Sequence, residues 1–178
     1  MQWTFDPSHT SLAFAVKHMG VFTVRGRFGR VSGVAETTED GRLRTVRATI
    51  DAASIDTAEP NRDAHLRSPD FLDAERFPTL TFVSTRIEPR GPSRYRVTGD
   101  LTIRDQTRRV TFEAETSGPV TDPWGNRRAG VTATGVLNRK DWDLTWNKIL
   151  ELGTLLVGEE IQFTIDAEAT AAAPAAVA

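Results

Sequence analysis

The sequence contains no cysteine among its 178 residues. It therefore excludes a disulfide framework, a thiolate nucleophile and any zinc or iron–sulfur site that needs cysteine ligands. A long hydrophobic run is also missing, since no stretch approaches the ~20 apolar residues that span a bilayer. Residues 1–7 have neither the basic nor the apolar segment of a signal peptide. These absences predict a cytoplasmic protein that is stabilised by packing alone and has no integral membrane association.

Charge of one sign is missing as well, because 22 lysines and arginines stand against 24 aspartates and glutamates and leave a formal net charge of -2. Such a balanced surface does not concentrate phosphate backbones around the protein, so the sequence predicts no nucleic-acid partner. The hydrophobic fraction of 39% suits one compact core,. We expect one domain over residues 1–170 and a low-complexity, Ala-rich tail over residues 171–178.

What the sequence does contain is a period-two alternation of apolar and polar residues through most of its length. Alternation indicates strands with one face buried and one face in water. About eight such strands can close into a barrel or stack as a sandwich, and closure is favoured because it removes the exposed edges. We therefore predict an all-β, eight-stranded antiparallel β-barrel. The alternating segments are residues 94–104, 12–16, 46–50, 110–115 and 161–166, with weaker runs at 24–36, 79–87 and 129–138.

One segment interrupts the alternation. Residues 58–78 are bounded by Pro60 and Pro78 and have the composition of a short helix followed by a second helical turn,. We expect this segment to cap one end of the barrel.

Several positions on the inward faces carry almost no side chain. An eight-stranded barrel is only just wide enough to be filled by side chains or to hold one small ligand, so small inward residues favour a cavity. Alternatively, small residues alternate with large ones simply to fill the tapering interior. The positions are Ala48, Gly99, Ala114, Ala133, Gly135 and Ala167.

Several segments together form a pattern that is specific in its order and spacing. They are residues 3–10, 14–20, 25–28, 54–57, 61–66, 70–78, 97–103, 122–127, 138–147 and 156–158. In this order and spacing they resemble the YceI family of polyisoprenoid-binding proteins. The resemblance implies a lipocalin-like barrel that holds a long isoprenoid or similar amphiphile in an apolar lumen, with no catalysis established for the family as a whole. Many members are exported to the periplasm, and this sequence differs from them in lacking a recognisable signal peptide.

Inward positions and aromatic residues together predict the wall of a lipid-binding cavity. In most proteins such residues are core, and in a barrel with small inward residues they can be both core and wall. The predicted wall residues are Leu12, Phe14, Val16, Phe22, Phe28, Ala48, Phe71, Phe82, Leu101, Ile103, Phe112, Ala133, Trp146 and Phe163.

A polar headgroup at the barrel mouth needs cations or hydrogen-bond donors. Arginine suits a phosphate group, although arginines also coat solvated strands and charges on a short helix also serve as caps and local ion pairs. The headgroup candidates are Lys17, His18, Arg25, Arg62 and His65.

Two other kinds of site are not supported by the sequence. The histidines His9, His18 and His65 match no metal-binding spacing, so we predict no metal and no cofactor,. A triad of Ser8, His9 and Asp56 is unfavourable, because Ser8 lies on no nucleophile elbow and adjacent strand residues point in opposite directions.

The sequence therefore predicts non-enzymatic binding, transport or storage of a long-chain polyisoprenoid or similar lipid. The alternative is an enzyme that acts on a small apolar or isoprenoid substrate inside the barrel, with His18 or an acid at the mouth as proton donor. A third reading is a structural or partner-binding barrel with a filled core. The sequence leaves open whether two copies form a homodimer through a barrel edge.

Overall fold

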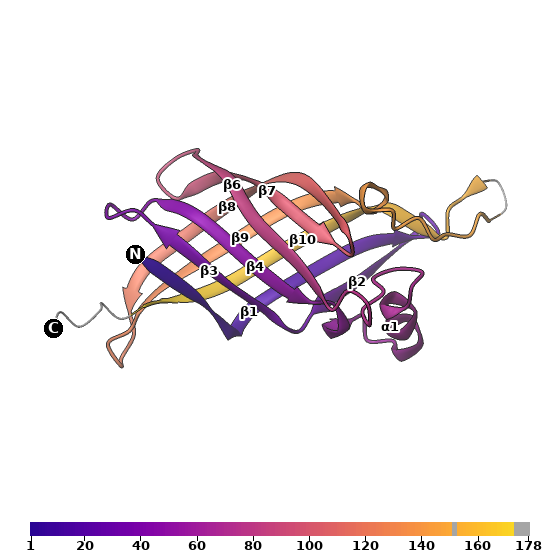
Figure 1. Cartoon of the computed structure of the whole chain (residues 1–178), viewed down its shortest axis with the longest axis horizontal. Helices are drawn as coiled ribbons and strands as arrows, with labels where there is room; N and C mark the ends of the chain where they lie inside the picture. Colours follow the sequence, from indigo (N-terminus) through magenta and orange to yellow (C-terminus); the bar gives the residue numbers. More distant parts are fainter. Residues whose placement is uncertain (151–152, 173–178) are drawn as a thin grey trace.

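The computed structural model describes residues 1–150 and 153–172. Ten strands form a single sheet that curves around the molecule (Figure 1). Their bounds are β1 Gln2–His18, β2 Phe22–Phe28, β3 Val31–Thr37, β4 Leu43–Asp51, β5 Ile55–Asp56, β6 Thr79–Pro89, β7 Arg94–Ile103, β8 Gln106–Thr121, β9 Arg127–Asn138 and β10 Val157–Ala171.

Eight of the ten strands close into a ring in the order β10, β9, β8, β7, β6, β4, β3, β1. The pair β1 and β10 completes the ring, and its register runs from Trp3 opposite Ala171 to His18 opposite Val157. Every pairing in the ring is antiparallel. The predicted eight-stranded antiparallel barrel is confirmed.

The strand β1 bends, which gives it two neighbours along one edge. Its register against β10 shifts between Phe5 and Thr10, a segment that includes Pro7. Before the bend β1 pairs with β3, and after it β1 pairs with β2, which in turn pairs with β5. The alternating run expected over residues 24–36 is therefore two strands on either side of this bend.

The only α-helix among the described residues is α1, Pro60–Arg67. It begins with proline at its first position, where no backbone N–H is needed, and the Glu59 carboxylate accepts from the N–H groups of Asn61 and Arg62,. The expected second helical turn is present only as one hydrogen-bonded turn, in which the Phe77 N–H donates to the Asp73 carbonyl at 2.8 Å; Asp73, with a left-handed φ of 48°, precedes it and separates it from α1. Two 3-10 helices, η1 Ala52–Ser54 and η2 Arg139–Trp142, complete the elements.

The barrel has two distinct ends. The helix end carries α1, η2 and the turn between β1 and β2, whereas the turn end carries the N-terminus and the β3–β4 and β8–β9 turns (Figure 1). The buried residues fall into three groups, one around Trp142 at the helix end, one around Phe82 and Val97, and one around Trp3 and Phe5. The core thus lines the barrel along its whole length.

No helix in residues 1–150 and 153–172 has both the length and the apolar composition of a membrane-spanning helix. The strand β10 includes Ala171. The rest of the expected tail, from residue 173 on, lies outside the described residues.

Candidate lipid-binding cavity

The barrel encloses one elongated cavity of about 910 Å³, with side chains from both ends and from the strands between them in its wall. Binding sites for small molecules have volumes of about 300–1,000 Å³, so this cavity lies near the upper end of that range. Most of its lining is apolar, because the inward positions of the alternating strands carry aliphatic and aromatic side chains. The predicted wall residues that line it are Leu12, Phe14, Val16, Phe28, Ala48, Phe71, Phe82, Leu101, Ile103, Phe112, Ala133, Trp146 and Phe163.

The headgroup candidates Lys17, His18, Arg62 and His65 also line the cavity, all at the helix end. Two predicted residues do not reach it. Phe22 lies on the same face of β2 as the wall residues Val24 and Phe28, but it pairs with His18 at the last rung of the β1–β2 ladder, beyond the cavity, and is 64% exposed. Arg25 lies on the opposite face of β2 and points into water.

Only some of the small inward residues leave space for a ligand in the cavity. Gly99 and Gly135 leave no space, because a Cβ atom at these positions would lie 2.4 Å from the Phe82 ring and 2.6 Å from the Phe163 ring. These glycines instead allow the phenyl rings to lie against the barrel wall. Room for a ligand comes from Ala48, Ala114 and Ala133, which do line the cavity.

The smallest side chains of the cavity wall lie next to each other on adjacent strands in the middle of the barrel. Ala133 on β9 is paired with Ala114 on β8 and with Ile165 on β10, and it is 4% exposed. Next to them Phe112 packs against Phe82 and Phe163 with ring centroids 5.3 and 5.6 Å apart. A larger side chain at position 133 would therefore enter the cavity midway between its ends.

At the helix end, Arg62 is held in place by its own neighbours. Its Nε donates to Thr57 Oγ1 at 2.7 Å and its Nη2 to the Thr57 carbonyl at 2.9 Å. The buried carboxylate of Asp63 accepts from the backbone N–H and the hydroxyl of the same Thr57. The guanidinium is thus oriented, and its Nη1 donates no hydrogen bond to any residue that the structure describes.

His65 lies beside Arg62 at the same end. Its Nε2 lies 2.8 Å from Asp70 Oδ2, and its ring packs edge-on against Phe71 and Trp146 with centroids 5.1 and 4.6 Å away. The ring makes no second hydrogen bond within the described part of the chain, so the His65–Asp70 pair is not connected to a nucleophile. Its geometry suits a ring that closes the mouth of an apolar cavity.

A further cation at this end escapes sequence analysis. Arg139 lines the cavity and is 5% exposed. Its guanidinium donates to four backbone carbonyls, those of Leu144, Trp146, Val157 and Gly158. Burial lowers the pKa of Arg139 below its usual value, but an arginine titrates so far above neutrality that it stays charged. Arg139 therefore ties the segment after η2 to the start of β10.

The turn end of the cavity was also missed. Its lining is mostly hydroxyl and backbone from turns, and Trp3 beneath it donates from Nε1 to Thr37 Oγ1 at 3.1 Å. The N-terminal ammonium donates to the Thr37 carbonyl at 2.7 Å. Trp124, in the β8–β9 turn, is 81% exposed and does not line the cavity. The polar lining residues at this end are Thr37, Thr38, Glu39, Thr116, Ser117 and Arg127.

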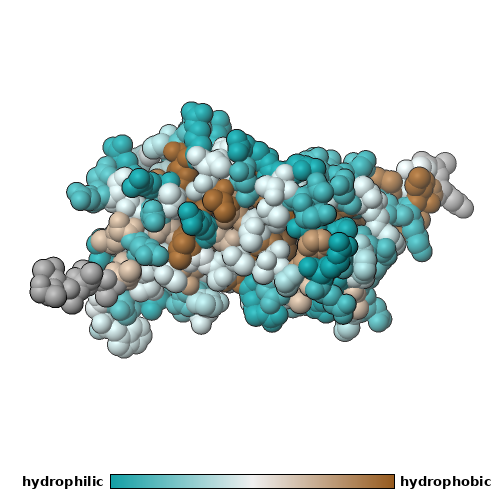
Figure 2. Space-filling view, viewed as in Figure 1, coloured by the Kyte–Doolittle hydropathy of each residue, from teal (hydrophilic) through white to brown (hydrophobic). Residues whose placement is uncertain are grey.

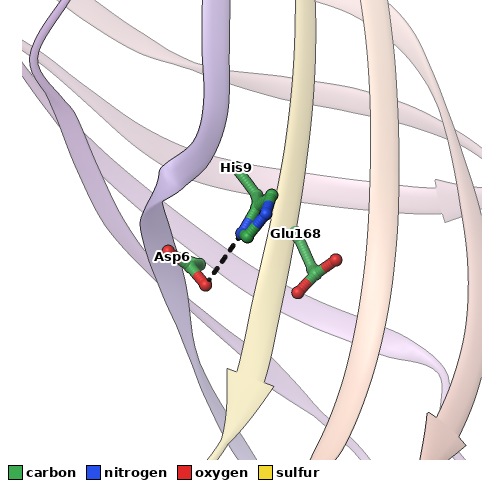
Figure 3. A group of neighbouring side chains, drawn as sticks. All are labelled: Asp6, His9 and Glu168. Atoms are coloured by element: carbon green, nitrogen blue, oxygen red, sulfur yellow. Dashed lines mark hydrogen bonds and ion pairs between the residues drawn. The ribbon is translucent and has the colours of Figure 1, made fainter. Parts of the chain in front are cut away.

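Outside the cavity, near the bend in β1, Asp6, His9 and Glu168 bring possible ligand atoms within 4.8 Å of one another (Figure 3). His9 Nδ1 lies 3.1 Å from Asp6 Oδ2. The Arg128 guanidinium already balances the negative charge of this group. Its Nη1 donates to both Asp6 and Glu168, and its Nε donates to Asp122 at 2.8 Å. The group is an ion-pair network, and a metal ion would have to displace the guanidinium.

The residues considered for a hydrolase triad do not meet. His9 is bonded to Asp6, whereas Asp56 accepts from Arg27 Nη2 at 3.1 Å and from the Ala58 N–H. The hydrogen bond from the Ala58 N–H and, to a smaller extent, the one from Arg27 hold the pKa of Asp56 below its usual range. Asp56 therefore serves the β2–β5 pair.

Two solved structures share this fold. The YceI protein of Campylobacter jejuni superimposes with a TM-score of 0.76 at 26% identity, over 88% of this chain and 90% of its own. A domain from Saccharophagus degradans, described as a polyisoprenoid binding domain, superimposes with a TM-score of 0.74 at 13% identity, over 96% of this chain and 98% of its own. The lipocalin-like barrel of the YceI fold is confirmed.

The sequence comparison agrees with the structural one. A UPF0312 protein of Staphylococcus aureus strain MSSA476 is 36% identical over 168 residues, which are 93% of this chain and 95% of the relative. The profile of the YceI-like domain matches residues 3–169. The match covers both ends of the cavity and every strand of the barrel, and the chain therefore belongs to the YceI-like family.

Proposed function

We propose that the protein binds a long-chain polyisoprenoid or a similar amphiphilic lipid in the barrel cavity, and carries or stores it without catalysing a reaction. The observation that supports this proposal is the apolar cavity of about 910 Å³ that extends from one end of the barrel to the other. An elongated apolar space suits an alkyl or isoprenoid chain better than a compact polar metabolite. The relative from Saccharophagus degradans, which shares the fold, is described as a polyisoprenoid binding domain.

Apolar burial alone is sufficient for tight binding. Each methylene that leaves water contributes ~0.8 kcal/mol, so about ten of them contribute roughly 8 kcal/mol before the cost of association. Affinity should therefore rise with the length of the chain until the cavity is filled. A wall with few polar groups discriminates between ligands mainly by the length and flexibility of their chains.

The helix end is where we place the headgroup. Arg62 is oriented by Thr57 and keeps Nη1 available, and Lys17, His18 and Asn61 also line this end. An oriented guanidinium binds phosphate oxygens well. A phosphate or diphosphate head would thus lie near Arg62, with the chain extending past Ala133 toward the turn end.

The polar groups of the cavity support binding more than catalysis. Most N–H groups of Arg62 and Arg139 already donate to Thr57 and to backbone carbonyls, and His65 is paired with Asp70. Catalysis of acyl or phosphoryl transfer needs a nucleophile or a water within reach of a positioned base. The hydrogen bonds within the described residues instead hold these side chains still.

The direct test is mass spectrometry of an organic extract from purified protein, combined with Ala133→Trp. An indole at position 133 projects into the middle of the cavity, so the variant should lose retained lipid and fail to bind a fluorescent fatty probe. The control is Val136→Trp, three residues along the same strand on the outer face, where Val136 is 55% exposed. The control should bind like the wild type.

Stability measurements separate this proposal from a filled barrel. Overpacking a filled core typically costs ~1 to 3 kcal/mol. A strongly destabilised Ala133→Trp variant, from a wild type that retains no lipid, would contradict the proposal. So would undiminished lipid binding by a folded variant. An extract whose lipid is chemically altered on incubation with the protein would favour an enzyme.

A further inference from the structure

Beyond the cavity, the helix end carries apolar side chains that the barrel does not bury. In the turn between β1 and β2, Met19 is 43% and Val21 83% exposed, and Phe22 at the start of β2 is 64% exposed. Ile149, in the segment between η2 and β10, is 76% exposed. Figure 2 shows hydrophobic surface at this end of the molecule. We call these four residues the apolar tip.

The two parts of the apolar tip belong to one surface. The Met19 N–H donates to the Leu156 carbonyl at 2.9 Å, and the Leu156 N–H donates to the Lys148 carbonyl at 2.9 Å. The β1–β2 turn and the segment that carries Ile149 are therefore joined through Leu156.

The β1–β2 side of the tip carries only positive charge, whereas the η2 and β10 segments at the same end carry the exposed acids Asp141, Asp143 and Glu160; the whole chain has a formal net charge of -2. Residues 7–35 contain no aspartate or glutamate. Arg27 and Arg30 in this stretch are paired with Asp56 and Asp51. Lys17 and Arg25 are exposed, and neither is within ion-pair distance of a carboxylate in residues 1–150 and 153–172.

The tip also adjoins the cavity. Lys17, His18 and Leu156 line the helix end of the cavity, and Met19 directly follows His18. A ligand that leaves the barrel at this end emerges beside the apolar tip. The surface that docks the protein and the mouth of the cavity are thus the same end of the molecule.

We propose that the apolar tip inserts into the interfacial layer of an anionic lipid bilayer and that Lys17 and Arg25 pair with the headgroups. Exposed apolar side chains flanked by cations are the combination that holds a protein at such an interface. A bilayer is a planar partner that satisfies apolar insertion and negative charge together. Docking in this way places the cavity mouth against the membrane.

The turn end provides a contrast within the same chain. Trp124 is 81% exposed there, which makes it as available as Val21. The turn that precedes β4 carries the exposed acids Glu39 and Asp40. Trp124 lies at the opposite end of the barrel from the apolar tip, so it serves as the matched control.

The test is co-sedimentation of the full chain with vesicles of phosphatidylcholine alone or mixed equally with phosphatidylglycerol. The wild type should bind the mixed vesicles. The double variant Val21→Glu, Phe22→Glu should bind them at least about tenfold more weakly, because two apolar side chains no longer insert. Lys17→Glu, Arg25→Glu should weaken binding to the mixed vesicles and make the remainder insensitive to salt. Trp124→Glu should bind like the wild type.

Failure to bind mixed vesicles would overturn the proposal, as would an equal loss in Trp124→Glu. Sedimentation velocity tests whether a second copy of the chain covers the tip. A wild-type dimer that becomes monomeric in the Val21→Glu, Phe22→Glu variant would show that the tip pairs two copies instead. Docking does not depend on what fills the cavity, so the lipid content of the same preparations is measured separately. Tip variants that retain lipid but do not dock would leave the proposed binding function intact.

Discussion

Each end of the barrel is tied together by one arginine, and the two arginines use opposite kinds of acceptor. At the helix end, Arg139 is buried and donates only to backbone carbonyls. At the turn end, Arg128 lies on the outer surface and pairs with the three carboxylates of Asp6, Asp122 and Glu168. Backbone carbonyls do not titrate in acid solution, whereas carboxylates do. The same residue type thus makes one set of contacts insensitive to acid and the other sensitive.

The difference also follows from where the segments come from. Arg139 joins backbone from the η2 segment to backbone from β10, and it does so inside the cavity wall. Arg128 joins the bend of β1, the β8–β9 turn and β10 from outside. Removing the first should disturb the ligand site, and removing the second should disturb only the closure of the barrel.

The largest effect should come from Arg139→Met. The side chain fills the same space, but four carbonyls lose their donor, and each unsatisfied buried group costs ~1 to 3 kcal/mol. We expect a loss of about 3 kcal/mol or more in the free energy of unfolding, measured by urea denaturation. The control is Lys140→Met, because Lys140 is next in sequence and makes only an exposed pair with Glu159, worth ~0 to 1 kcal/mol. Equal stabilities for the two variants would contradict the assignment.

A second prediction compares the ends as headgroup sites. Arg62→Leu should weaken binding of a polyprenyl phosphate by about tenfold to a hundredfold, because a hydrogen bond to a charged group is worth ~1.5 to 3 kcal/mol. Binding of the uncharged polyprenol of equal length should hardly change. Arg62→Lys keeps the charge and should restore part of the affinity. Fluorescence titration measures all three.

The matched change at the turn end is Thr38→Val, which removes a cavity-lining hydroxyl. It should leave both affinities unchanged if the head lies at the helix end. A loss of phosphate affinity in Thr38→Val and none in Arg62→Leu would reverse the orientation of the ligand.

Period-two alternation predicted the barrel and nearly all of its wall, because the face on which a strand residue lies is a local property. Phe22 shows the limit of that argument. Its face is the one expected, but β2 continues past the end of the cavity, and where a cavity ends depends on how far the other strands extend. Gly99 and Gly135 show a second limit, since the rings that cover them come from Phe82 on a neighbouring strand and Phe163 on another.

The two arginines that hold the ends of the barrel together, Arg139 and Arg128, were not predictable from the sequence. Arg139 stands in the polar run Asn138-Arg139-Lys140-Asp141, which is typical of a solvated turn, and it is buried because residues 144–146 and 157–158 fold over it. The hydroxyls of the turn end follow no period at all. Arg62 could be named in advance because the interruption of the alternation at residues 58–78 predicted a short helix that caps the barrel, and arginine on such a helix suits a phosphate headgroup.

A smaller effect is expected for Arg128→Met at neutral pH. The network is partly exposed, and exposed ion pairs contribute little. The variant should be less stable than the wild type but clearly more stable than Arg139→Met, and its lipid retention should be unchanged because Arg128 does not line the cavity. Retained lipid is measured in the same extract. A loss of lipid equal to that in Ala133→Trp would contradict the separation of the two ends.

The smallest effect, and the most specific, is the response of the turn end to acid. Hydrogen bonds from His9, from the Ser8 N–H and from Arg128 lower the pKa of Asp6 to about 2, and hydrogen bonds from Arg128 and Asn126 hold the pKa of Asp122 well below its usual range. An aspartate in the unfolded chain titrates near ~3.9. Since both pKa values are lower in the folded state, the two carboxylates stabilise the fold fully above that value, and their contribution is lost as the pH falls from about 4 to about 2.

Urea midpoints measured across this window should therefore fall with decreasing pH in the wild type and fall equally steeply in Arg139→Met, whose acceptors do not titrate. In Arg128→Met the fall should be shallower, because the folded-state pKa of Asp122 returns toward its usual value while Asp6 keeps the hydrogen bond from His9. An equal slope in all three proteins would show that the acid sensitivity of the barrel lies in other carboxylates. A shallower slope in Arg139→Met would mean that the contacts of Arg139 titrate too, and the contrast between the two arginines would not hold.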